Sequence, residues 1–345
     1  MERHQRQGFR AHVQSGREHV RSFNGVMRES AWILSHHGGL LSLLASTLVL
    51  PLCFMLLSHT LVSVPLIQRI RQDKEFVQAH SGTDAARDRQ TDLSSEWVYL
   101  LIFFAVYLLC VLAFSLLSTA AVVYSVACMY LENSISYRKV ISVVPTVWKR
   151  LIVTFLWVFI LIFAYHAIAI LFFHLIYENF PEISFVAFVL VVVLVWFAFF
   201  CIHVYISCIW HLSSVITVLE DSYGLRALLK SVELIKGNRR VAIQLFIVYL
   251  GLVTLISFVF HGYVLGLLIE DGAGSSLSLR LLLGTALVAL FTFVTLYGML
   301  AQTVFYFACK AFHNEQIDWV ALSDHLAAYM GEYVQLKSAI QMESV

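Results

Sequence analysis

Charge is what this sequence has least of. Only 13% of its 345 residues are Asp, Glu, Lys or Arg, and 60% are hydrophobic, whereas ordinary soluble domains carry roughly 25% charged residues. A soluble core of this length could not hide so much apolar surface. The scarcity of charge therefore excludes a soluble globular protein and predicts an integral membrane protein.

Motifs of catalysis and metal binding are missing as well. The chain has no GxSxG, HExxH, Walker or dinucleotide-binding pattern. Its six cysteines form no CxxC pair and no His/Cys cluster with metal spacing, so neither a disulfide framework nor a zinc site is predicted. The cysteines lie in or at the ends of apolar runs and are expected to be buried small hydrophobes. No cofactor and no enzymatic activity are expected.

What is present is a set of six apolar runs without any Asp, Glu, Lys or Arg. The runs are 40–67, 97–131, 151–177, 184–219, 241–269 and 281–309. About 20 apolar residues cross a bilayer as a helix, and the absence of strand alternation argues against a barrel. We predict an all-α polytopic membrane protein with six transmembrane helices in residues 39–310. A basic N-terminal segment at 1–38 and an amphipathic helix at 311–345 flank them. Pro51, one of four prolines, is expected to kink the first helix.

The basic residues predict the orientation of the chain. Segments 1–39, 132–150, 220–240 and 310–345 hold 17 Lys and Arg, whereas the opposite links hold 6. The more basic side faces the cytosol in most membrane proteins, so both termini are expected there, in an endomembrane (ER or Golgi) or the plasma membrane. The link at 68–96 is polar and mixed in charge, and we expect a flexible surface loop.

The stretch "LEDSYGLRALLKSVELIKGNRR" at 219–240 has the pattern of a basic amphipathic helix. Its apolar face holds Leu225, Leu228, Leu229, Val232 and Ile235, and Arg226, Lys230 and Glu233 fall on the other face. Asp221 or Ser222 is expected to cap its start, and Gly237 to end it. Such a helix lies in the membrane interface on anionic lipids, or packs on its own bundle as a connector, and the two can hold together. The expected membrane-interface cations are Arg150, Arg226, Lys230, Lys236, Arg239 and Arg240.

A threefold repeat is suggested by a gapless alignment of Ser30, Ser142 and Ser231. Each of the three segments begins with polar residues or a short helix and runs into a span at the same distance. Each unit would consist of a cytosolic interfacial helix, a span, an outer loop and a returning span. The identities are few, so the pattern rests on spacing.

The two terminal segments have helical patterns of their own. A stripe at spacings of three and four predicts a helix that binds a protein partner or a second copy, or that folds back on the bundle. The stripe consists of Trp319, Leu322, Leu326, Tyr329, Tyr333, Leu336 and Ile340. The N-terminal segment reads as a basic arm near anionic lipid, and its glycines argue against a stiff helix. Its cations are too sparse for nucleic-acid binding.

Histidines are the main titratable groups inside the runs. His166 is expected near mid-membrane, His203 and His211 toward the inner side, and His174 and His261 toward the outer side. Such scatter in depth does not make a metal cage, and neutral imidazoles most often hydrogen-bond between helices. Glu132 and Glu220 each follow a span. They could form a carboxylate site, but carboxylates there more often cap a helix or pair with nearby cations.

Residues 28–63, 218–240 ("VLEDSYGLRALLKSVELIKGNRR") and 309–339 resemble a plant family of uncharacterised six-span membrane proteins. Some of its members carry the automatic label polyadenylate-binding-protein-binding protein. The chain is also distantly similar to the membrane domain associated with bacterial glycerophosphodiester phosphodiesterases, whose chemistry belongs to a separate soluble barrel. The resemblance implies a plant endomembrane or plasma-membrane protein and supplies no site residues.

The leading hypothesis for function is a non-enzymatic scaffold or membrane-organising and trafficking component that acts through cytosolic helices. The alternative is a transporter or lipid-handling protein whose cavity is polar but uncharged. An intramembrane enzyme ranks last, because only histidines and the two interfacial glutamates could supply its catalytic group.

Overall fold

The computed structural model describes residues 22–80, 83–131, 136–179, 185–265 and 277–313, and every element among them is a helix. The predicted stripe from Trp319 to Ile340 and the arginines before Ser22 lie outside the described residues. Six helices are long and apolar enough to cross a membrane. They are Gly38–Ala79, Asp92–Tyr130, Tyr137–Glu178, Val186–Leu219, Arg239–Tyr263 and Ser278–Phe312. The predicted all-α, six-span fold is therefore confirmed.

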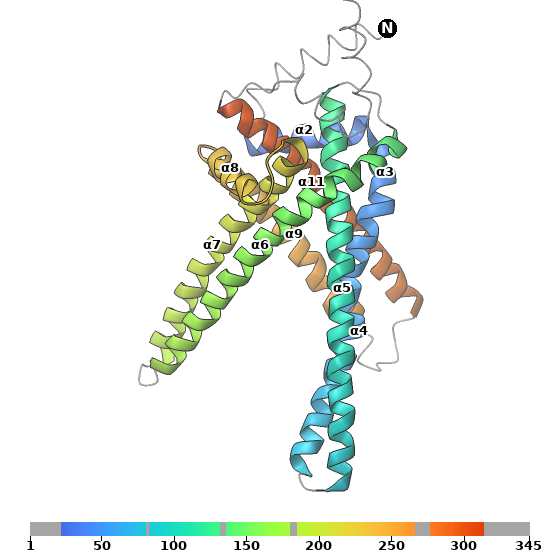
Figure 1. Ribbon diagram of the computed structural model, residues 1–345, viewed down its shortest axis with the longest axis vertical. Coiled ribbons are helices and arrows are strands. Elements are labelled where there is room, and N and C mark those ends of the chain that lie inside the picture. The colour runs from blue at the N-terminus through green and yellow to red at the C-terminus, as the bar shows by residue number, and fades with distance from the viewer. Residues whose placement is uncertain (1–21, 81–82, 132–135, 180–184, 266–276, 314–345) are drawn as a thin grey trace, which may run out of the picture. The chain divides into compact units, whose positions relative to one another are not determined.

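The element order follows the sequence pattern closely (Figure 1). The elements are α2 (Phe23–His36), α3 (Gly38–Leu44), the π-helix η1 (Ala45–Val49), α4 (Leu50–Ala79), α5 (Asp84–Tyr130), α6 (Tyr137–Asn179), α7 (Phe185–Leu219), α8 (Leu225–Ile235), α9 (Arg239–Val259), the π-helix η2 (Phe260–Leu265) and α11 (Leu277–Phe312). Residues 22–43, 119–251 and 296–313 form one compact unit, and residues 44–118 and 252–295 form a second.

Just before Pro51, where a kink is expected, the helix takes a π-helical turn. η1 ends at Val49, and Pro51 lies in the first turn of α4. Proline has no N–H and its ring crowds the carbonyl four residues earlier, so a wider turn before it relieves both problems. Pro65 lies inside the same helix, which continues to Ala79.

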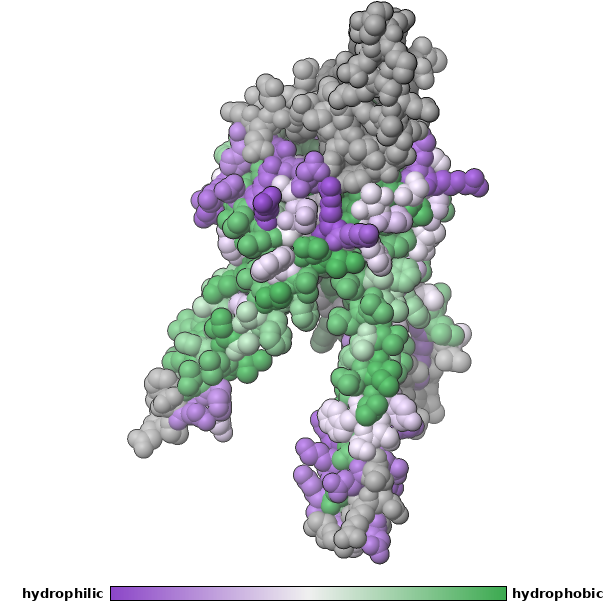
Figure 2. All heavy atoms as spheres, viewed as in Figure 1, coloured by the Kyte–Doolittle hydropathy of each residue, from purple (hydrophilic) through white to green (hydrophobic). Residues whose placement is uncertain are grey.

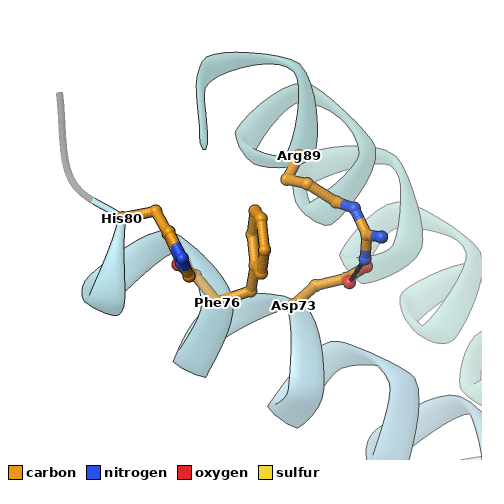
Figure 3. Close-up of polar contacts among 4 residues, drawn as sticks. All are labelled: Asp73, Phe76, His80 and Arg89. Carbon is orange, nitrogen blue, oxygen red and sulfur yellow. Dashed lines mark hydrogen bonds and ion pairs between the residues drawn. The ribbon is translucent and has the colours of Figure 1, made fainter. Parts of the chain in front are cut away.

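The expectation of a flexible loop at 68–96 is wrong. Helix α4 continues through Ala79 and α5 starts at Asp84, so most of this segment is a helical hairpin. Arg89 pairs with Asp73 across the hairpin, and its guanidinium also lies over the Phe76 ring, which stacks on His80 (Figure 3). Opposite charges and a cation–π contact at matching levels hold the two helices together. Composition alone missed this pairing because it depends on contacts between residues 16 apart.

The first unit has its core at one end of its spans. Val122 and Val126 of α5, Ile216 of α7, and Leu300 and Val304 of α11 are all buried there. Buried hydroxyls accompany them, and two of these, Ser125 and Thr217, donate to carbonyls four residues earlier in their own helices. These hydroxyls are thereby satisfied without water, and their small size lets the helices approach closely.

The far half of the α6–α7 hairpin is different, because its side chains face outward. Phe163, Ile170, Leu194 and Phe197 are all at least 60% exposed, and the hydropathy colouring shows an apolar surface along both helices (Figure 2). In a spanning hairpin that surface faces acyl chains or other membrane helices.

Candidate membrane-interface site

A largely buried carboxylate, 14% exposed, marks the point where α7 ends. Glu220 accepts from Lys230 of α8 (Nζ–Oε2, 2.6 Å), from Lys310 of α11 (Nζ–Oε1, 2.8 Å) and from the Tyr306 hydroxyl of α11 (2.6 Å). Burial by itself raises the pKa of Glu220, but the three donors outweigh it, so its pKa lies below the usual 4.5. The expected pairing of this glutamate with nearby cations is confirmed. Glu132 lies outside the described residues.

The loop between α7 and α8 is fixed to α6. The Gly224 N–H donates to the Thr154 hydroxyl (2.8 Å), which also hydrogen-bonds the Thr217 hydroxyl (3.0 Å). Arg150 pairs with Asp221 (3.0 Å). Both threonines are fully buried. A buried backbone N–H needs an acceptor, and here the acceptor lies on α6, so this bond fixes the start of α8 relative to α6.

The predicted caps of α8 are half right. Asp221 and Ser222 do not cap its start, because Gly224 is the N-cap residue, at φ +62°, and Asp221 turns toward Arg150. Gly237 does end the helix, at φ +96°, and the Phe312 ring lies where its side chain would be. The His313 ring N–H donates to the Leu234 carbonyl (3.2 Å) in the last turn. The helix is therefore anchored at both ends.

The apolar residues of α8 divide into two strips. Leu228 and Ile235 are buried, as are Ala227, Ser231 and Leu234. Leu225 and Leu229 are 48% and 58% exposed, and Val232 is half-buried between the strips. The two interpretations of this helix thus apply to adjacent strips of its surface: one packs on the bundle, and the other is open to the surroundings.

The six predicted interface cations also fall into two groups. Lys230 and Arg150 are paired with Glu220 and Asp221. The other four are exposed, namely Arg226, Lys236, Arg239 and Arg240. They lie on α8, in the turn after it and at the start of α9, so the exposed charge gathers around the same short helix (Figure 2).

The start of each hairpin repeats one burial pattern, which supports the threefold repeat. Three buried positions at i, i+4 and i+7 recur in α2, in the first turns of α6 and in α8. They are Val26, Ser30 and Ile33; Val140, Val144 and Val147; and Ala227, Ser231 and Leu234. Ser142, which the gapless alignment paired with Ser30 and Ser231, is exposed. In the repeat that begins with α6, the buried position that matches Ser30 and Ser231 is therefore Val144, two residues after Ser142. Packing preserves the buried face of the helix and not the serine.

Helix α2 is held to the first unit in a similar way. The Tyr297 hydroxyl donates to the Met27 carbonyl (2.6 Å), and the Tyr130 hydroxyl donates to Glu29 (3.4 Å). Ser22 caps its start by accepting from the Gly25 N–H (3.2 Å). Gly25 therefore does not prevent a helix over Phe23–His36, because the cap and tertiary contacts override the weak propensity of glycine.

One pair of intramembrane histidines lies at the same level, contrary to the expected scatter in depth. The rings of His166 and His203 lie side by side, with centroids 5.8 Å apart, so the predicted difference in depth is wrong for this pair. His211 stacks on Trp210. Within the described ranges, no three His, Cys, Asp or Glu side chains gather as a metal site. Cys201 is exposed, contrary to the expectation that all cysteines are buried.

Comparison with known proteins gives a family match and little else. The profile of a family described as Domain of unknown function (DUF8558) matches residues 18–345. No curated protein and no solved structure matches the chain.

Proposed function

The chain belongs to the DUF8558 family, and we propose that it is a non-enzymatic scaffold that organises the membrane through helices at its cytosolic surface. The observation that carries the proposal is the placement of α8. This helix is fixed to its bundle by Glu220 and Thr154, while Leu225 and Leu229 face outward.

The depth of α8 follows from its hydrogen bond to α6. Arg150 is the last charged residue before the apolar run of α6, and Thr154 lies four residues further into that run. At 1.5 Å per residue, the Gly224–Thr154 bond places the start of α8 about 6 Å to the apolar side of Arg150. Interfacial helices lie about 5–10 Å into the boundary between headgroups and acyl chains. Leu225 and Leu229 would therefore contact acyl chains, and Arg226 would reach the headgroups.

A helix fixed at this depth would act as a wedge in one leaflet. Its exposed leucines add area at the acyl boundary, and the four exposed cations attract anionic lipids at about 1 kcal/mol each. The excess of Lys and Arg in the segments on this side, 17 against 6, supports a cytosolic position for α8 and for both termini. The resemblance to plant six-span proteins supports an endomembrane or plasma-membrane location. The helix predicted from Trp319 to Ile340 would add a site for a protein partner or a second copy.

The proposal is tested with the full chain in phosphatidylcholine vesicles, with and without phosphatidylserine. We expect rising protein density to deform the vesicles and to concentrate a fluorescent phosphatidylserine near the protein. Leu225→Asn with Leu229→Asn should remove the deformation. Glu233→Asn, a change on the exposed polar strip of the same helix, should leave it intact. Wild-type behaviour of the double leucine variant would contradict the proposal.

The second candidate is a transporter or lipid-handling protein, and a polar pair inside the spans favours it. The Thr154–Thr217 pair is an uncharged polar contact between α6 and α7. The same vesicles decide between the two candidates. Flux of a solute or lipid that is lost in His166→Ala would replace the scaffold proposal.

A further inference from the structure

Three polar side chains gather on the α6–α7 hairpin near the middle of its spans. The His203 ring lies 5.9 Å from the Tyr165 ring and 5.8 Å from the His166 ring, between centroids. The Tyr165 hydroxyl donates to the Phe199 carbonyl (2.6 Å), which fixes it to α7. His166 is exposed and His203 is half-buried. An apolar hairpin thus carries a polar patch, consisting of Tyr165, His166 and His203, at the depth where lipid solvates polar groups worst.

The two imidazoles keep unused hydrogen-bonding groups. The His166 Nδ1–H donates to the Ile162 carbonyl of its own helix (2.8 Å), so in the neutral ring Nε2 is left as an acceptor. His203 has ring neighbours but no hydrogen-bond partner within the described part of the chain. Its neutral ring has one N–H donor. Polar side chains at this depth almost always face protein or water rather than lipid.

We propose that this patch is the contact between two copies of the chain. A donor on His203 and an acceptor on His166, at the same depth, make the patch complementary to itself. A two-fold axis along the membrane normal would place His203 of each copy opposite His166 of the other. Such an interface is isologous, which means that both copies use the same patch. The two reciprocal N–H···N bonds use the His203 donor and the free His166 acceptor of both copies. Neither apolar run carries a formal charge, so nothing on it selects an oppositely charged partner.

The contact is tested by disulfide trapping of the full chain in nanodiscs and native-like vesicles. Ile170 lies one turn from His166 on the same face of α6 and is 70% exposed; Ile168, at the same depth and 61% exposed, points to the opposite side. In a background with Cys110 and Cys201 replaced by Ser, Ile170→Cys should form a covalent dimer under mild oxidation. Ile168→Cys should form at least about fivefold less, because Cβ atoms must approach within about 4.5 Å.

The histidines supply the second readout. His203→Ala should weaken dimerisation roughly tenfold, since two interhelical hydrogen bonds are lost, and His203→Gln, which keeps an N–H donor, should restore most of it. Photobleaching step counts in nanodiscs measure this without cysteine chemistry, and an unchanged thermal melt shows that the variant is folded. Equal trapping at Ile168→Cys and Ile170→Cys, a monomer in the step counts, or dimerisation indifferent to both histidines would overturn the proposal.

Discussion

The contacts of Glu220 and Thr154 form the anchor of α8. Replacing Glu220 should weaken this anchor more than the removal of any other single charge at this surface. Its side chain is 14% exposed, and its partners Lys310 and Lys230 are 15% and 32% exposed. Removing one partner of a buried ion pair costs about 3–5 kcal/mol, because the other charge stays buried without compensation. Since Lys230 keeps some access to water, we expect Glu220→Gln to cost about 3 kcal/mol.

The neighbouring residue supplies the control. Asp221 also forms an ion pair, with Arg150, but its side chain is 79% exposed. Exposed pairs contribute about 0–1 kcal/mol, so Asp221→Asn should change stability little. For a chain of this length about 2 °C of melting temperature corresponds to 1 kcal/mol. We therefore expect a drop of about 6 °C for Glu220→Gln and about 1 °C for Asp221→Asn.

The assay is thermal unfolding of the detergent-solubilised full chain, followed by size-exclusion chromatography with fluorescence detection. A double-mutant cycle with Lys310→Met isolates the pair, and its coupling energy should be about 1.5–3 kcal/mol. Equal melting temperatures for the Glu220 and Asp221 variants, or effects of Glu220→Gln and Lys310→Met that simply add, would refute the reasoning.

Three further outcomes are expected from the same anchor. Because the pKa of Glu220 is lowered in the folded protein, the stabilisation by this group is complete above pH 4.5 and is lost as the pH falls through its pKa in the folded state. Melting temperatures measured across pH should show this loss in the wild type and not in Glu220→Gln. Gly237→Ala should cost about 1–3 kcal/mol from its φ of +96° and overlap with Phe312, whereas Gly251→Ala, with open space around it, should be neutral or stabilising in the same melt. Thr154→Val should cost about 1–3 kcal/mol by leaving the Gly224 N–H without its acceptor, whereas equal melts for Thr154→Val and the exposed Thr285→Val would contradict this.

The six spans could be predicted because their signal is local. Each run is long and free of formal charge, and a helix is the usual way for such a run to satisfy its backbone in lipid. The position of α8 was also within reach, since Leu228 and Ile235 recur at helical spacing and Gly237 follows them. The N-cap was not, because Asp221 turned from the helix to Arg150, a contact between residues 71 apart in the sequence.

The anchor itself was only partly predictable. Pairing of Glu220 with cations was expected, but Tyr306 was not, although Tyr306 and Lys310 lie four apart on one face at the end of the last span. That spacing is the one signal that could have indicated them. The role of Thr154 had none, because threonine in a span usually bonds its own backbone, and its second partner comes from a loop 70 residues away.

Depth in the bilayer tests the central claim about α8 most directly. In the full chain with Cys110 and Cys201 replaced by Ser, a fluorophore is attached to the cysteine of Leu229→Cys. The labelled protein is reconstituted in nanodiscs and exposed to lipid-borne and aqueous quenchers. We expect quenching by shallow acyl-chain quenchers at position 229 and by aqueous iodide at a matched Glu233→Cys label, one turn along the helix. Strong iodide quenching at both positions would contradict it, because α8 would then lie in water.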